Sequence, residues 1–254
     1  MTTRKFDITK LLAPMVLVIL YGFFSVFGNN FFSTDYLINI LDGSYYIGFM
    51  AIGVTFVIIT GGIDLSLGTT MMCAALIGGM AYNSWHWPMG WCLALVLVVA
   101  TLIGLLNGIM VAYMGLPPFI ATLGTQMMGM GFGAIVTKVQ TMRYPTFGTA
   151  DGWFKNFFYK TTTGFPVGAI WLAAFFVVAL IILNKTRFGR YTYAIGSNAE
   201  AARLSGIKTK PWLAGVYTFC GFCCGAAGVF YAAVYTSIIP STGKGQASSS
   251  AARR

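Results

Sequence analysis

Residues 184–210 read NKTRFGRYTYAIGSNAEAARLSGIKTK, and they form the one strongly charged stretch that lies between two long apolar segments of the chain. They contain six basic residues and a single acid, Glu200, although only 9% of the whole chain is charged. Loops rich in Lys and Arg stay on the cytoplasmic side of a membrane protein. The stretch therefore predicts a membrane protein and fixes the side to which the flanking segments return.

A short helix is expected inside this loop. Ser197 and Glu200 have the S-x-x-E spacing of a capping box, and residues 199–204 favour helix. Gly206 follows at the position where a helix end is expected. We predict a surface helix of about two turns.

The composition is that of a polytopic membrane protein. Hydrophobic residues make up 57% of the 254 residues, above the roughly 45–50% that is usual in soluble domains. The net charge of +10 is concentrated at the N-terminus and in loops, which membrane orientation explains better than nucleic-acid binding does. The predicted fold class is all-α, a polytopic bundle of transmembrane helices, and no nucleic-acid partner is expected.

About seven apolar runs are long enough to cross a hydrocarbon core of about 30 Å. They cover residues 11–28, 45–60, 65–82, 91–113, 119–137, 167–184 and 211–236. We take the first as a retained span rather than a signal peptide, because no small-x-small cleavage site follows it. Only Gly61, Gly62, Ile63 and Asp64 separate the second run from the third, so residues 45–82 are either a tight hairpin or one interrupted helix.

Charge favours the hairpin. If the basic N-terminus is inside, six crossings return residues 185–210 to the cytoplasm, whereas a single span at 45–82 would leave them outside. The same arrangement puts residues 138–166 on the outer side. We therefore predict a transmembrane domain over residues 1–240, with the 185–210 loop cytoplasmic, followed by a disordered Ser- and Ala-rich tail over 241–254.

Glycine pairs four residues apart predict close helix contacts within the bundle. The pairs are Gly104 with Gly108, Gly129 with Gly133, and Gly221 with Gly225.

The chain has few residue types suited to catalysis, so we do not expect an enzyme. It has one histidine, His86, beside two tryptophans, and only six acids. No G-x-x-x-x-G-K-[ST] occurs, so the chain cannot bind ATP by a P-loop, and no bound cofactor is expected. Its five cysteines lie in apolar runs, which predicts neither a disulfide nor a metal site. A transporter of this kind would take its energy from an ion gradient or from a separate ATPase.

Polar residues at membrane depth are few. Asp64 is either a cap for the helix that follows it or a group with a substrate or coupling role. The other candidates either line a path for a hydroxylated solute or hydrogen-bond neighbouring helices. They are Asn107, Thr122, Thr125 and Gln126.

Three blocks of sequence carry a family resemblance. They are TGGIDLSLG at 60–68, NG at 107–108 followed by PPFIATLG at 117–124, and FGRY at 188–191 continuing through AIGSN at 194–198 to AARLSGI at 201–207. In this order and spacing they resemble the permease subunit of bacterial ribose-type ABC sugar importers. The resemblance runs from about residue 10 to residue 245.

The resemblance implies a multi-pass subunit of the bacterial inner membrane, with a cytoplasmic N-terminus and membrane lipid around it. It implies a second permease subunit, like or unlike, cytoplasmic ATPase subunits that bind ATP and Mg, and a periplasmic sugar-binding protein. It also implies that part of the basic loop docks on the ATPase. The docking residues would be Ser197, Asn198, Glu200, Ala201, Ala202, Arg203, Leu204, Ser205 and Gly206.

The resemblance ends after residue 245, where the family continues with further spans and this chain has only QASSSAARR. We therefore expect a C-terminally truncated or frameshifted product. A non-transporting membrane fragment or scaffold is the alternative function, and an ion-coupled secondary carrier is a third, which the shortage of buried ionisable groups disfavours.

Overall fold

The computed structural model describes residues 9–28, 34–161 and 164–240. The predicted tail, 241–254, lies outside the described residues. The chain forms two compact units, residues 1–41 and residues 42–254. The first unit contains α1 (Thr9–Phe27) and the beginning of α2 (Thr34–Ile59).

The second unit is almost entirely helical, which confirms the predicted all-α class. It holds the remainder of α2 and eight further α-helices among the described residues. These are α3 (Leu67–Asn83), α4 (Met89–Ala112), α5 (Pro118–Val136), α6 (Trp153–Phe158), α7 (Val167–Lys185), α8 (Arg187–Ser197), α9 (Ala199–Leu204) and α10 (Thr209–Val234). A 3₁₀ turn, η1 (Ala150–Gly152), and two short strands, β1 (Met142–Arg143) and β2 (Ser237–Ile238), complete it.

Each predicted apolar run coincides with a helix, but the predicted number of membrane spans is not confirmed. Five helices within the described residues are long and apolar enough to cross a membrane. They are Tyr36–Ile59, Met89–Ala112, Pro118–Val136, Val167–Lys185 and Thr209–Val234. By contrast, α3 has only 17 residues.

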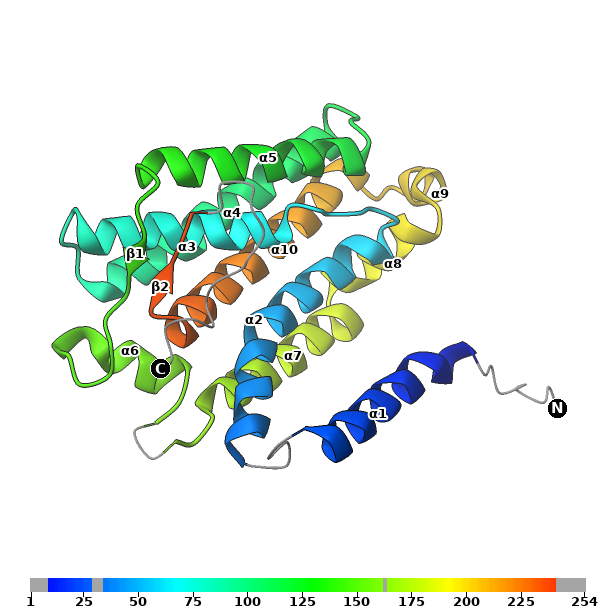
Figure 1. The fold of residues 1–254 in the computed structure, drawn as a ribbon. Coiled ribbons are helices and arrows are strands. Elements are labelled where there is room, and N and C mark those ends of the chain that lie inside the picture. Colours follow the sequence, from blue (N-terminus) through cyan, green and yellow to red (C-terminus); the bar gives the residue numbers. More distant parts are fainter. Residues whose placement is uncertain (1–8, 29–33, 162–163, 241–254) are drawn as a thin grey trace. The chain divides into compact units, whose positions relative to one another are not determined.

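Residues 45–82 form two helices rather than one interrupted helix. The chain leaves α2 at Gly61, whose φ of +80° suits glycine. Residues 60–66 then pass along the bundle, and α3 runs back in the opposite direction (Figure 1). The two runs are therefore separate helices, and that each of them crosses the membrane, as charge favours, stays a prediction.

The bundle is built around α10, the most buried of the five long apolar helices. Of its apolar window 72% is buried, against 17–33% for the other four. Its closest partner is α4, because glycines face one another across that contact. A Cβ added at Gly104 would lie 2.7 Å from the Gly221 Cα atom, and one added at Gly108 would lie 2.8 Å from the Ala214 Cα atom. The predicted role of these glycines in close helix contacts is confirmed.

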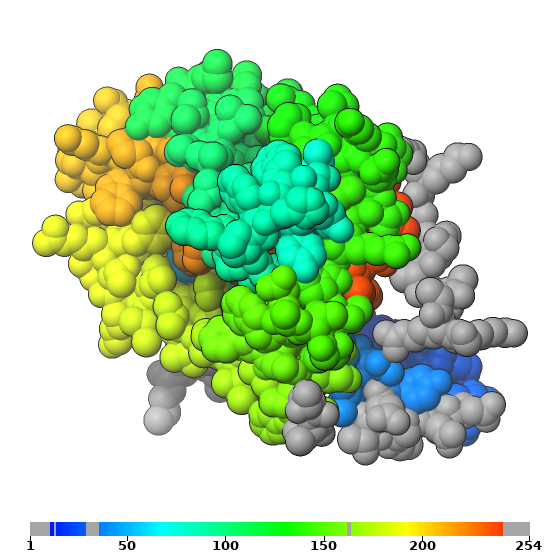
Figure 2. Space-filling view, turned by 90° about the vertical axis from the view of Figure 1, so that its left-hand side faces the viewer, coloured from blue at the N-terminus to red at the C-terminus, as the bar shows by residue number. Residues whose placement is uncertain are grey.

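Residues 138–161 fold onto one end of the bundle. There β1 pairs with β2 in antiparallel register, Met142 opposite Ile238. The Tyr144 hydroxyl donates to the Ala75 carbonyl at 2.6 Å, which ties this segment to α3. Figure 2 looks onto this end and shows the segment beside the turn between α3 and α4. From residues 138–161, α7 runs along the bundle to the opposite end. There it is followed by α8 and α9 (Figure 1).

Lys155, on α6 at this end, is a buried lysine. It is 2% exposed, its Nζ donates to the Ala233 carbonyl at 2.7 Å, and it lies 5.7 Å from the centroid of the Phe154 ring. Burial lowers the pKa of Lys155 to about 8. No carboxylate pairs with this ammonium group among the described residues.

This burial predicts a pH-dependent stability. Below pH 8 the lysine carries its proton in both the folded and the unfolded state. Between pH 8 and the ordinary lysine pKa the folded protein has released that proton while the unfolded chain still binds it, so the free energy of unfolding rises with pH. Thermal unfolding in detergent from pH 7 to 9.5 should show this rise, and Lys155→Met should remove it. Lys138→Met, at an exposed lysine just after α5, is the control; an unchanged slope in Lys155→Met would contradict the assignment.

Candidate functional site

The predicted short helix in the basic loop is present as α9, but its cap differs from the prediction. Ser197 is the last residue of α8, and Asn198 caps α9 instead. The Asn198 Oδ1 atom accepts hydrogen bonds from the Glu200 and Ala201 amides at 3.0 and 2.9 Å. The predicted capping box is therefore wrong. The Glu200 carboxylate instead accepts hydrogen bonds from Arg203.

The end of α9 is closed by Gly206, as predicted. Gly206 has a φ of +84°. Its amide donates to the Arg203 carbonyl at 3.0 Å, and the Ile207 amide donates to the Ala202 carbonyl at 3.1 Å. These two bonds form a Schellman motif, which satisfies carbonyl groups that the end of the helix leaves free.

The outer surface of α9 combines an ion pair with an exposed apolar side chain. Arg203 Nε donates to Glu200 Oε2 at 3.1 Å, and this bond holds the pKa of Glu200 below its usual range. Leu204 is 76% exposed, whereas Ala202 is buried against the protein. The outer face of α9 therefore offers a partner one apolar side chain beside an ion pair.

A second helix in the basic loop, α8, was not predicted. Thr186 accepts a hydrogen bond from the Gly189 amide at its start. The signal was available, because Phe188, Thr192 and Ile195 follow at i, i+4 and i+7 and so share one face. Thr192 and Ile195 are buried.

The face of α8 that carries Phe188 packs onto the two long helices α2 and α10. The Phe188 ring lies 5.9 Å from that of Phe56 on α2 and 6.0 Å from that of Phe219 on α10, between centroids. Gly196 lies so close to the Ile59 carbonyl oxygen that a Cβ there would overlap it. These contacts make α8 a rigid platform, packed against α2 and α10, which holds α9 at the end of the bundle.

A cluster of buried polar groups lies at the beginning of α3. The Asp64 Oδ1 atom accepts hydrogen bonds from the Ser66 amide at 2.8 Å and from the Ser66 hydroxyl at 2.7 Å. Asn107 Nδ2 donates to the same hydroxyl at 2.9 Å. The Leu65 amide donates to the Thr122 hydroxyl at 3.2 Å. Residues 60–66 are thus tied to α4 and α5.

The structure brings together three of the five predicted polar residues. Asp64, Asn107 and Thr122 meet through residues 65 and 66, and they are 6%, 1% and 0% exposed. Thr125 is also buried but bonds within its own helix, to the Thr122 carbonyl at 3.0 Å. Gln126, half-buried on α5, makes no hydrogen bond to the cluster within the described residues.

Sequence reasoning missed two members of this region. Ser66 is the residue directly before α3 and links Asp64 to Asn107. Tyr217, on α10, is fully buried, and its hydroxyl lies against Gly62. Neither the Tyr217 hydroxyl nor Asn107 Oδ1 has a hydrogen-bond partner among the described residues. Only the folded arrangement shows that these residues are neighbours.

The described residues contain no group of three or more His, Cys, Asp or Glu side chains that could hold a metal ion. All five cysteines are free and buried. His86 lies in the turn between α3 and α4, beside Trp85 and Trp87, whose ring centroids are 5.5 Å apart.

Five long apolar helices, together with a platform that presents a short helix, define a multi-pass membrane protein. A family model described as "Branched-chain amino acid transport system / permease component" matches residues 36–250. The chain belongs to this family of transport permeases. As a permease component it is part of a transporter and not an enzyme.

Curated relatives agree with this membership. The chain is 34% identical to the ribose import permease protein of Haemophilus influenzae, over 95% of this chain and 75% of the relative. It is 35% identical to the ribose import permease protein of Escherichia coli K12, over 91% and 71%. It is 30% identical to the fructose import permease protein of Rhizobium meliloti, over 91% and 66%. The chain thus spans two thirds to three quarters of these relatives, and no solved structure matches it.

Proposed function

We propose that the chain is the transmembrane subunit of an ATP-driven ABC importer for a monosaccharide. The observation that carries this proposal is the similarity, over nine tenths of the chain, to permeases named for the import of ribose and fructose. The absence of a P-loop motif fits a subunit that depends on a separate ATPase. The partners would be an ATPase that binds ATP and Mg, a periplasmic sugar-binding protein and a second permease subunit.

The orientation we propose follows from charge. Six basic residues in the loop at 184–210 favour the cytoplasmic side of the bacterial inner membrane for α8 and α9. The basic N-terminus would lie on the same side. In this orientation α9 faces an ATPase in the cytoplasm, and residues 138–161 face the periplasm.

We propose that residues 197–206, the docking segment, make the contact with the ATPase. Three features support this role. The segment is held by its own cap and Schellman motif, it exposes Leu204 beside the Glu200–Arg203 pair, and α8 fixes it to α2 at Gly196. A rigid segment of this kind can transmit a movement of the bound ATPase to the helix bundle without itself unfolding.

The polar cluster has a mechanical role in this proposal. Gly196 of α8 abuts Ile59, only a few residues before Asp64, and the bonds of Asp64, Ser66 and Asn107 tie that segment to α4. Asp64 therefore acts as a structural group at the start of α3. Movement of the docking segment would reach the interior of the bundle through residues 60–66. A solute-path role is proposed only for Thr125 and Gln126, which lie outside these bonds.

Uptake in proteoliposomes tests the proposed function. The chain is reconstituted with ABC ATPase subunits and a ribose-binding protein from the organism that encodes it, and labelled ribose is supplied outside. We expect uptake that requires ATP on the ATPase side and that stops when the ATPase is left out. Uptake that persists without ATPase and follows a proton or sodium gradient would instead establish a secondary carrier. Retention of the ATPase without any uptake would favour a non-transporting fragment.

A further inference from the structure

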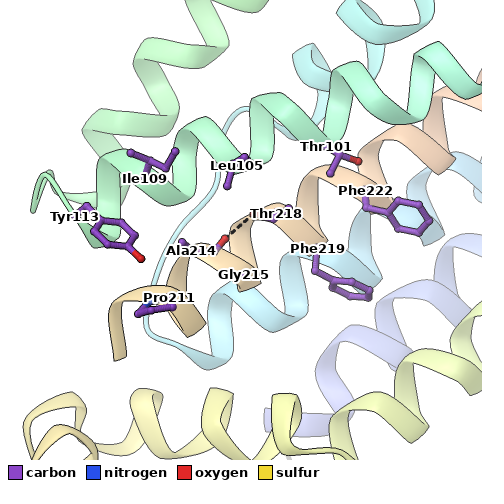
Figure 3. Close-up of a pocket in the computed structure, with 10 residues that line it drawn as sticks. All are labelled: Thr101, Leu105, Ile109, Tyr113, Pro211, Ala214, Gly215, Thr218, Phe219 and Phe222. Atoms are coloured by element: carbon purple, nitrogen blue, oxygen red, sulfur yellow. Dashed lines mark hydrogen bonds between the residues drawn. The ribbon is translucent and has the colours of Figure 1, made fainter. Parts of the chain in front are cut away.

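A groove of about 990 Å³ runs between α4 and α10. Figure 3 shows its lining, with Tyr113 and Pro211 at one end and Thr101 and Phe222 at the other. Leu105 and Ile109 line the α4 side. The long axis of the groove therefore follows the two helices.

Small residues on α10 create the groove. Ala214, Gly215 and Thr218 leave a channel beside the larger side chains of α4. The Thr218 hydroxyl donates to the Ala214 carbonyl at 2.8 Å, so it is satisfied within its own helix. A Cβ added at Gly215 would meet only Phe188, at 3.5 Å, so this groove-lining position has room for a side chain. The surface that lines the groove is therefore almost entirely apolar.

The walls of the groove belong to two of the helices that are long and apolar enough to cross a membrane. Leu105, Ile109 and Phe222 are 37%, 40% and 39% exposed. In a membrane span, exposed apolar surface of this kind is covered by lipid hydrocarbon or by another apolar helix rather than by water. An extended acyl chain matches both the elongated shape and the apolar lining.

At the end of the groove that Tyr113 and Pro211 line, α10 begins with two basic residues that flank the groove without lining it. Tyr113 is there, and Lys210 directly precedes Pro211, with Lys208 two residues earlier. Both lysines are exposed, and neither has an ion-pair partner among the described residues. Basic side chains at the end of a membrane helix attract anionic lipid headgroups.

We propose that this groove binds one phospholipid with an anionic headgroup. An acyl chain would lie along Leu105, Ile109 and Gly215, and the headgroup phosphate would sit near Lys208 and Lys210. Charge complementarity favours an anionic lipid over a second copy of the chain. A second copy packed side by side would bring its own Lys208 and Lys210 to the same end, where like charges repel. The site is separate from the docking segment.

Native mass spectrometry of the purified chain tests the site. The probes are phosphatidylglycerol and phosphatidylcholine with identical acyl chains. We expect wild-type protein to retain one phosphatidylglycerol more tightly than phosphatidylcholine. Lys208→Gln combined with Lys210→Gln should weaken phosphatidylglycerol binding about fivefold for each lysine and leave phosphatidylcholine binding unchanged. Gly215→Leu, which fills the channel, should weaken binding of both lipids.

Matched variants separate this site from general effects of charge and volume. Lys185→Gln with Arg187→Gln removes the same charge at the same end of the bundle, and Gly90→Leu adds the same side chain to α4 where nothing lies within 4 Å of the added Cβ. Equal losses in the paired charge variants would overturn the headgroup assignment. A change of oligomeric state in Gly215→Leu, with lipid binding intact, would show that a second copy covers the groove. The assay contains neither ATPase nor sugar, so its result is independent of the proposed transport function.

Discussion

Gly104→Leu is expected to lower the melting temperature of the protein and its yield of folded material. A Cβ at this position would lie 2.5 Å from the Tyr217 carbonyl oxygen and 2.7 Å from the Gly221 Cα atom, and both are backbone atoms that cannot rotate aside. The helices α4 and α10 would have to separate along their contact. Overpacking of this kind costs about 1–3 kcal/mol or more, which is a large part of a stability of about 5–15 kcal/mol. Size-exclusion chromatography of detergent-extracted protein measures the loss.

Gly90→Leu is the control for this prediction, because Gly90 lies on the same helix with nothing within 4 Å of an added Cβ. It should elute as the wild type does. If Gly104→Leu also eluted as a folded species with the wild-type melting temperature, the close contact between α4 and α10 would be wrong.

Leu204→Asp is expected to reduce co-purification of the ABC ATPase at least tenfold. The side chain is 76% exposed on α9, so the substitution leaves the fold intact while it places a charge where we propose an apolar contact. A buried anchor residue of an interface is commonly worth 2 kcal/mol or more, and about 1.4 kcal/mol already corresponds to a factor of ten in affinity. Glu200→Lys, which sets a like charge beside Arg203, should act in the same direction. Quantitative pull-down of co-expressed ATPase measures both.

Met114→Asp is the matched control. Met114 is 68% exposed in the turn between α4 and α5, at the same end of the bundle but outside the docking segment. This variant introduces the same charge at comparable exposure and should retain the ATPase. Equal loss in Met114→Asp and Leu204→Asp would point to a broad electrostatic effect and not to a specific docking surface.

Local signals in the sequence predicted the long helices, α9 and the end of α9, because their causes lie within a few residues. Apolar runs located the long helices, and Gly206 marked a helix end that requires a positive φ. The cap was misplaced by one residue because Ser197 and Asn198 are adjacent and both residue types cap helices well. The structure decides in favour of Asn198, since α8 continues through Ser197.

Features that depend on contacts between distant segments were not predictable. The spacing of Phe188, Thr192 and Ile195 could have predicted α8 itself, but it does not show that Phe188 packs against Phe56 and Phe219. Ser66 reads as an ordinary residue before a helix, yet it joins Asp64 to Asn107 across a separation of more than forty residues. The number of membrane spans also depends on helix lengths, which apolar runs define only approximately.

Site-specific photo-cross-linking tests whether the docking segment contacts the ATPase. A benzophenone amino acid is placed at position 204 of the chain, co-expressed with the ABC ATPase subunits of its organism, and the membranes are irradiated. We expect a cross-link between position 204 and an ATPase subunit, and none from the same probe at position 114. A cross-link from position 114 with none from position 204 would rule out the proposed docking role, because the ATPase would then bind this end of the bundle without using the docking segment.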